Sequence, residues 1–70
     1  MQFEREELSG CLVAYSETTI GKSYWIDDGF AWAYLVVVQG DRAGPNIGKT
    51  LPFNTLDEAK SAAEKLEGET

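Results

Sequence analysis

The chain has 70 residues, of which 12 are Asp or Glu, 6 are Lys or Arg and none is His, so its formal net charge at pH 7 is −6 and its isoelectric point is about 4.3. Hydrophobic residues make up 43% of the chain, which favours a folded protein. The length suits one small domain over residues 1–70 and excludes a two-domain enzyme. The longest apolar run, residues 30–38, is too short for a transmembrane helix, and no signal peptide is apparent.

The acidic balance argues against direct binding to nucleic acid or to an anionic membrane, because both need clustered Lys and Arg. The six cations of this chain are scattered along the sequence. Electrostatic attraction therefore favours a basic protein or ribonucleoprotein as the partner, although an acidic surface also serves solubility.

Cys11 is the single cysteine, so an intramolecular disulfide is impossible and a reducing cytoplasm is the expected location. One cysteine without histidine cannot form a zinc site, and we expect no metal and no cofactor. Because Cys11 begins an apolar stretch and no His can activate it, we interpret it as a small, partly buried hydrophobic residue.

The first part of the chain is rich in β-forming residues. Residues 2–9 are charged and are predicted to form an arm or a short strand, and residues 11–18 are predicted to form a strand. After a turn at residues 20–22, residues 23–27 form the next predicted strand. The dipeptide Asp28-Gly29 then separates two aromatic segments, a pattern that predicts a tight hairpin with the glycine at positive φ.

Residues 30–39 form the longest and most apolar predicted strand, which we therefore expect to be central in the sheet. Residues 40–46 have the composition of a loop, and residues 47–53 are predicted to form a shorter strand. Since Pro52 cannot donate a ladder hydrogen bond, this strand is expected at an edge of the sheet, or to end there.

A helix is predicted over residues 55–67. Thr55 and Glu58 have the spacing of a capping box, and Asp57 and Glu58 suit the positive end of the helix dipole. Apolar residues, most of them alanine, then recur at helical spacing: Leu56, Ala59, Ala62, Ala63 and Leu66. Gly68 is expected just beyond the last turn, at the C′ position.

This order of elements predicts an α+β fold: an antiparallel sheet of three to four strands with one C-terminal helix packed on one face. The central strand is apolar on both faces, because alternation divides its side chains into two apolar sets. The sets are Phe30, Trp32, Tyr34, Val36 and Val38 on one face and Ala31, Ala33, Leu35 and Val37 on the other. One helix covers one face, so the second face needs another cover: the N-terminal segment, a second copy of the chain or a protein partner.

We expect Trp32, Tyr34 and Val36 to form the core under the helix, together with side chains of the neighbouring strands. Those neighbours are Tyr24, Ile26, Leu51 and Phe53. Trp25 then lies on the opposite face, either as a structural cover or as an anchor for a partner.

The chain lacks the residues of an enzyme active site. It has no His to act as a general base near neutral pH. Asp27 and Asp28 are adjacent and point apart, so we interpret them as turn residues instead of a catalytic carboxylate pair. The tripeptide Gly48-Lys49-Thr50 ends like a phosphate-binding loop, but Ala43 stands where that motif needs its first glycine. We therefore predict that the protein is not an enzyme.

Three acidic groups, together with Trp25, are the candidate partner-binding residues. The groups are Glu4, Glu6 and Glu7 near the N-terminus, Asp27 and Asp28 at the predicted hairpin, and Glu64 and Glu67 near the C-terminus. Carboxylates on a small rigid surface can imitate the phosphates of nucleic acid and occupy a basic groove. The alternative is that each group is simply a solvated surface.

The segment 52–64, which contains Thr55-Leu56-Asp57-Glu58-Ala59-Lys60, resembles the strand-to-helix junction of small phage and mobile-element proteins of the anti-CRISPR kind. Those proteins are similar to this chain in size, acidity and strand-then-helix order. They bind CRISPR surveillance complexes and block nucleic-acid binding or nuclease recruitment. The same segment is similar to the β-β-β-α module of HicB-type antitoxins, which neutralise a small basic RNase, although the chain lacks their Pro-Gly-Cys turn.

Both resemblances imply a small acidic module that binds and inhibits a basic nucleic-acid-handling protein, in the cytoplasm of the host cell if the chain is phage-encoded. Neither resemblance transfers a functional residue to this sequence. The alternative is a non-enzymatic structural domain that forms a homodimer through its uncovered sheet face.

Overall fold

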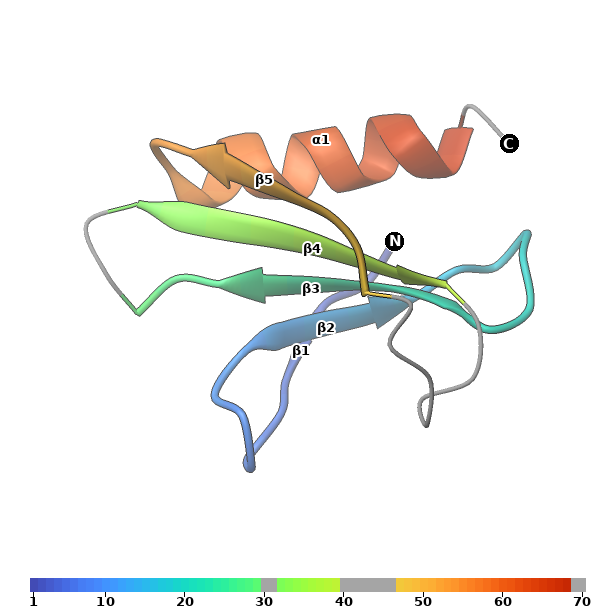
Figure 1. Cartoon of the computed structure of the whole chain (residues 1–70), viewed down its shortest axis with the longest axis horizontal. Coiled ribbons are helices and arrows are strands. Elements are labelled where there is room, and N and C mark those ends of the chain that lie inside the picture. Colours follow the sequence, from blue (N-terminus) through green and yellow to red (C-terminus); the bar gives the residue numbers. More distant parts are fainter. Residues whose placement is uncertain (30–31, 40–46, 69–70) are drawn as a thin grey trace.

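A single antiparallel sheet carries one helix on one of its faces (Figure 1). The structure is a computed structural model that describes residues 1–29, 32–39 and 47–68. The elements follow in the order β1 (Glu4–Arg5), β2 (Leu12–Tyr15), β3 (Lys22–Asp27), β4 (Ala33–Gln39), β5 (Ile47–Phe53) and α1 (Leu56–Gly68). The strands lie side by side in chain order, and each pairs antiparallel with the next.

This architecture confirms the predicted α+β fold with a C-terminal helix. The sheet has five strands instead of three to four, because part of the charged segment 2–9 forms the two-residue strand β1. β5 lies at an edge of the sheet, as Pro52 predicts. The predicted loop 40–46 and the first two residues of the predicted strand 30–39 lie outside the described residues.

The strand register decides which side chains meet on each face. Leu12 pairs with Ile26, Ile26 with Leu35, and Leu35 with Leu51, which makes one apolar row across four strands. Side chains directly opposite each other in a sheet lie on the same face. This row therefore forms one continuous apolar surface, and it is the surface on which α1 packs.

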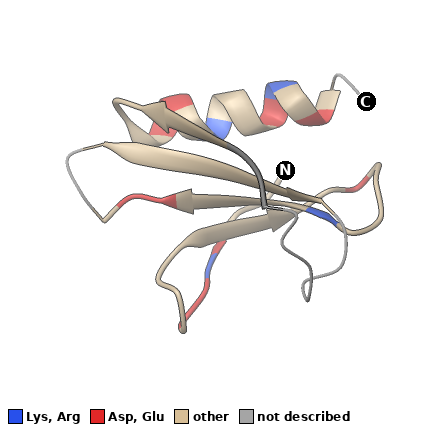
Figure 2. Ribbon diagram, viewed as in Figure 1, with Lys and Arg blue, Asp and Glu red and all other residues tan. Residues whose placement is uncertain are grey.

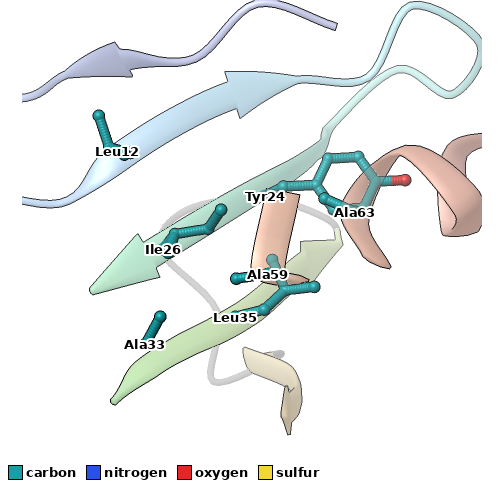
Figure 3. Close-up of a cluster of buried hydrophobic side chains, with 7 residues drawn as sticks. All are labelled: Leu12, Tyr24, Ile26, Ala33, Leu35, Ala59 and Ala63. Carbon is teal, nitrogen blue, oxygen red and sulfur yellow. The ribbon is translucent and has the colours of Figure 1, made fainter. Parts of the chain in front are cut away.

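The core lies between this surface and two alanines of α1 (Figure 3). Tyr24, Ile26 and Leu35 are fully buried, as are Ala59 and Ala63. The two alanines are four residues apart and so lie on the same face of the helix. Because their side chains are small, the helix backbone comes close to the sheet, and the larger side chains of β3 and β4 fill the space between them.

The expected core under the helix is wrong in part. Tyr24 and Ile26 are core residues, but Ala33 and Leu35 stand beside them in place of Trp32, Tyr34 and Val36. The reason is the register, which pairs even-numbered residues of β3 with odd-numbered residues of β4. Val36 therefore lies beside Trp25 on the other face, and Trp32 precedes β4 with 53% of its surface exposed.

The tight hairpin predicted at Asp28-Gly29 is also wrong. The ladder between β3 and β4 closes with Asp27 opposite Tyr34, and residues 28–32 separate the two strands. Gly29 does not have positive φ; among the described residues, the glycines that do are Gly10 and Gly21. The Asp27 carboxylate instead accepts a hydrogen bond from the Gly29 N–H at 3.0 Å, which starts the longer connection as an Asx turn.

The first turn of α1 is capped largely as the sequence predicts, but its last residue differs from the prediction. At the first turn, the Glu58 N–H donates to Thr55 Oγ1 at 3.2 Å, and the Glu58 carboxylate accepts from the N–H of Asn54 at 3.2 Å. The predicted capping box is therefore present, except that the Glu58 side chain binds the N–H of Asn54 instead of that of Thr55. Gly68 is the last residue of the helix and lacks positive φ, so the predicted C′ role is wrong.

Leu35→Ala is expected to lower the free energy of unfolding by about 2–5 kcal/mol, because the substitution leaves a cavity where the side chain packs against the helix. Leu8→Ala is the matched control, since the Leu8 side chain is 98% exposed. That substitution should change stability by less than about 0.5 kcal/mol. Chemical denaturation measures both values, and equal losses would contradict this core.

Candidate functional site

The sheet face away from α1 is the main candidate surface. The side chains that alternate with the core residues point to this face, and they include Val13, Trp25, Val36 and Val38. No described element lies over it (Figure 1). The N-terminal segment extends the sheet as β1, and its Met1 and Phe3 pack against the core.

Trp25 lies near the middle of this open face. Trp25 pairs with Val13 of β2 on one side and with Val36 of β4 on the other. The indole Nε1–H donates to Ser23 Oγ at 2.9 Å, and Ser23 is 7% exposed although it is polar. This hydrogen bond satisfies the indole donor and leaves Trp25 half-buried. The prediction that Trp25 lies opposite the helix is confirmed.

A groove of about 430 Å³ lies on the same face beside β1 and β2. Its described lining contains the carboxylates of Glu4, Glu6 and Glu17. The other lining residues are Gln2, Arg5, Val13 and Tyr15. Tyr15 is 63% exposed, which is unusual for a large aromatic side chain. Among the described residues, the groove lining thus combines Val13 and Tyr15 with three carboxylates and one guanidinium.

The guanidinium of Arg5 forms an ion pair with Asp28. It donates to both carboxylate oxygens of Asp28, at 2.7 and 3.0 Å, and to the carbonyl of Gly10 at 2.7 Å. The hydrogen bond from Arg5 holds the pKa of Asp28 below its ordinary value of 3.8. Asp28 therefore links the end of β3 to β1, and its negative charge is paired with that of Arg5.

Glu67 performs a similar structural task at the other end of the sheet. Its carboxylate accepts hydrogen bonds from the Ser16 hydroxyl at 2.7 Å, the Glu17 N–H at 2.8 Å, the Thr18 hydroxyl at 3.0 Å and the Tyr24 hydroxyl at 3.3 Å. These donors, Ser16 first, hold the pKa of Glu67 below its ordinary value of 4.5. The last turn of α1 is thereby fastened to the connection between β2 and β3.

The predicted acidic groups do not gather on one face (Figure 2). Arg5 brings Asp28 next to β1, so the first two groups are neighbours at one end of the sheet. Glu67 lies with Glu17 at the other end of β2 and β3. Glu7 and Glu64 are exposed, and Asp27 holds the Asx turn.

The cysteine and the metal-ligating residue types of the described chain form no reactive or metal-binding group. Cys11 is half-buried, and its N–H donates to Ser9 Oγ at 3.2 Å. Within residues 1–29, 32–39 and 47–68, no three His, Cys, Asp or Glu side chains are grouped so that they could hold a metal ion. In the same part of the chain, no helix is both long and apolar enough to cross a membrane.

Tyr15 and Glu17 are missing from the predicted site residues, although both line the groove. The signal for them is alternation: Gln2, Glu4 and Glu6 occupy every second position, and so do Val13, Tyr15 and Glu17. Two such segments on adjacent strands place all six side chains on one face. Recognising the face requires the pairing of Glu4 with Val13, which the strand register supplies.

Comparisons with protein-family models, with curated proteins and with solved structures found no match.

Glu67→Gln tests the fastening of α1 through its dependence on pH. Because folding lowers the pKa of Glu67, its ionised carboxylate stabilises the fold above pH 4.5, and this contribution is lost as the pH falls through the folded pKa. The stability difference between the original chain and the variant should therefore be constant near neutral pH and shrink below about pH 4.5.

Thermal unfolding followed from pH 3 to 8 measures this difference. Glu64→Gln is the matched control, because Glu64 is an exposed residue of the same helix. It should leave the melting temperature unchanged at neutral pH, where Glu67→Gln lowers it. Equal melting temperatures for the two variants at every pH would show that Glu67 does not stabilise the fold.

Proposed function

We propose that the chain is a small acidic protein-binding module that inhibits a basic protein or ribonucleoprotein which handles nucleic acid, as anti-CRISPR proteins do. It would act by occupying the nucleic-acid-binding or partner-binding surface of that protein. The observation that carries the proposal is the apolar sheet face opposite α1, which no described element covers. A net charge of −6 favours a basic partner for such a face.

The open face has the residue types that bind proteins well. Trp25 and Tyr34 are half-buried aromatic side chains, and Val36 lies between β3 and β5 beside Trp25. Aromatic side chains with part of their surface already packed contribute strongly to protein interfaces, because they lose little conformational entropy on binding. Burial of this face against a partner supplies affinity without any reacting group.

Charge would supply speed and selectivity. Glu4 and Asp27 are exposed, at the β1 edge and at the end of β3 respectively, so the apolar face has carboxylates beside it. Complementary charges accelerate association with a basic surface and disfavour acidic competitors. This arrangement allows the chain to compete with nucleic acid without having its sequence or its shape.

Capture followed by an inhibition assay tests the proposal. The tagged chain is used to capture proteins from a lysate of the source cells at low and high salt, and the captured protein is purified. We expect a basic protein that binds nucleic acid, released by high salt, and we expect the chain to displace labelled nucleic acid from it.

Two tryptophan variants localise the contact. Trp25→Ala should weaken inhibition by about tenfold or more, because it removes the central aromatic residue of the open face. Trp32→Ala is the matched control and should change inhibition by less than about twofold, since Trp32 lies beside the first turn of α1, in a separate shallow pocket with Phe53 and Glu58. Circular dichroism checks that both variants are folded.

Two results would overturn the proposal. One is a captured protein whose binding to nucleic acid the chain leaves unchanged. The other is a stable homodimer in light scattering that Trp25→Ala dissociates, with no protein captured. The second result would favour the structural alternative, with the open face as the interface between two copies.

A further inference from the structure

The dipeptide Asp28-Gly29 is the one place in the sequence where an Asp or Asn stands directly before a glycine. At such a pair the backbone nitrogen of the glycine can attack the side-chain carboxyl carbon of the aspartate, because glycine has no Cβ to hinder the approach. A C–N bond forms, and the carboxyl hydroxyl leaves as water with the proton of the nitrogen. Water then opens the resulting succinimide ring at either carbonyl, so the net result is aspartate or its isomer isoaspartate.

The position of the pair in the fold leaves it accessible to this reaction. β3 ends at Asp27, so Asp28 and Gly29 lie beyond the ladder with β4. Gly29 is exposed, and the side chain of Asp28 is 23% exposed. Water can therefore reach the ring once it has formed, and burial does not protect the pair.

Arg5 instead engages the carboxyl group that would react. Its guanidinium donates to Asp28 Oδ1 at 2.7 Å and to Asp28 Oδ2 at 3.0 Å. The attack needs this carboxyl group to turn to the Gly29 nitrogen and to lose one of the two oxygens, so the pairing must break first. The hydrogen bond from Arg5 also lowers the pKa of Asp28 and keeps the group ionised. An ionised carboxylate is a poor electrophile, because its oxygen must gain a proton before it leaves as water.

A second carboxylate engages the nitrogen that would attack. The Gly29 N–H donates to Asp27 Oδ1 at 3.0 Å. The nitrogen loses this proton in the reaction, so the hydrogen bond to Asp27 is lost as well. Negative charge that develops on the nitrogen is also disfavoured beside the Asp27 carboxylate. Both reacting groups of the dipeptide are thus held by contacts within the fold.

We propose that Asp28 is a modification site, converted to isoaspartate through its peptide bond with Gly29, and that Arg5 and Asp27 keep it unreactive in the folded chain. Arg5 belongs to β1, a two-residue strand at the edge of the sheet, so local opening of β1 removes its protection. Isoaspartate adds one carbon to the backbone at the end of β3 and moves the free carboxylate to the α carbon. The modified chain therefore loses the link between β1 and β3. This inference is independent of the proposed function.

Folded variants incubated at neutral pH test the proposal. Methylation by an isoaspartate-specific methyltransferase counts the product, and peptide mapping locates it. Arg5→Gln should form isoaspartate about two- to fivefold faster than the original chain, because the ion pair is lost. Asp27→Ala keeps Arg5 and should also accelerate the reaction. Gly29→Ala, combined with Arg5→Gln, should suppress it, since a methyl group then hinders the attack.

Two controls separate local protection from general loss of stability. Lys65→Gln removes a positive charge from the last turn of α1, and Glu67→Gln loosens the other end of the sheet. Both should leave the rate at Asp28 unchanged, and circular dichroism checks that every variant is folded. In concentrated urea, the original chain and Arg5→Gln should react equally, and faster than the folded original chain.

Three results would overturn the proposal. The first is an equal rate for the original chain, Arg5→Gln and Asp27→Ala under folding conditions. The second is an acceleration by Glu67→Gln as large as that by Arg5→Gln. The third is isoaspartate that peptide mapping locates at a residue other than Asp28.

Discussion

The close approach of α1 to the sheet is the constraint on which the rest of the structure depends. Ala59 and Ala63 are fully buried and present no bulk, so the helix lies against Tyr24, Ile26 and Leu35 without a second layer of large side chains. A chain of this size has one small core, and this contact is its centre. Polar contacts at the two ends of the sheet stabilise this packing, and the apolar side chains that do not take part in it lie on the other face.

Two polar contacts complete the fastening at opposite ends of the sheet. The Glu67 carboxylate accepts hydrogen bonds from the hydroxyls of Ser16, Thr18 and Tyr24 and from the Glu17 N–H. These bonds join the end of the helix to the β2–β3 connection. A carboxylate near a helix C-terminus is unfavourable for the helix dipole, and these donors offset that cost. Arg5 and Asp28 join β1 to the end of β3 in the same way. Two of the acidic side chains, Asp28 and Glu67, therefore stabilise the fold.

The open face and its groove follow from the same geometry. Since one helix covers one face, Trp25 and Val36 remain on a surface without a described cover, and the carboxylates that line the groove remain beside it. Asp28 and Glu67 are less suited to a basic partner, because their carboxylates already hold parts of the fold together.

The sequence by itself determined the α+β order, the edge position of β5, the bounds of that strand and the capped start of α1, because these depend on local propensity, Pro52 and the Thr55–Glu58 spacing. It also placed Tyr24 and Ile26 in the core and Trp25 opposite the helix. It could not decide which face of β4 the helix covers, because both faces are apolar. The tertiary structure decided this through the register of β3 and β4, which sets Leu35 beside Ile26 and leaves Val36 beside Trp25. The register of β1 on β2 likewise placed Glu4 opposite Val13, which the alternating pattern alone does not specify.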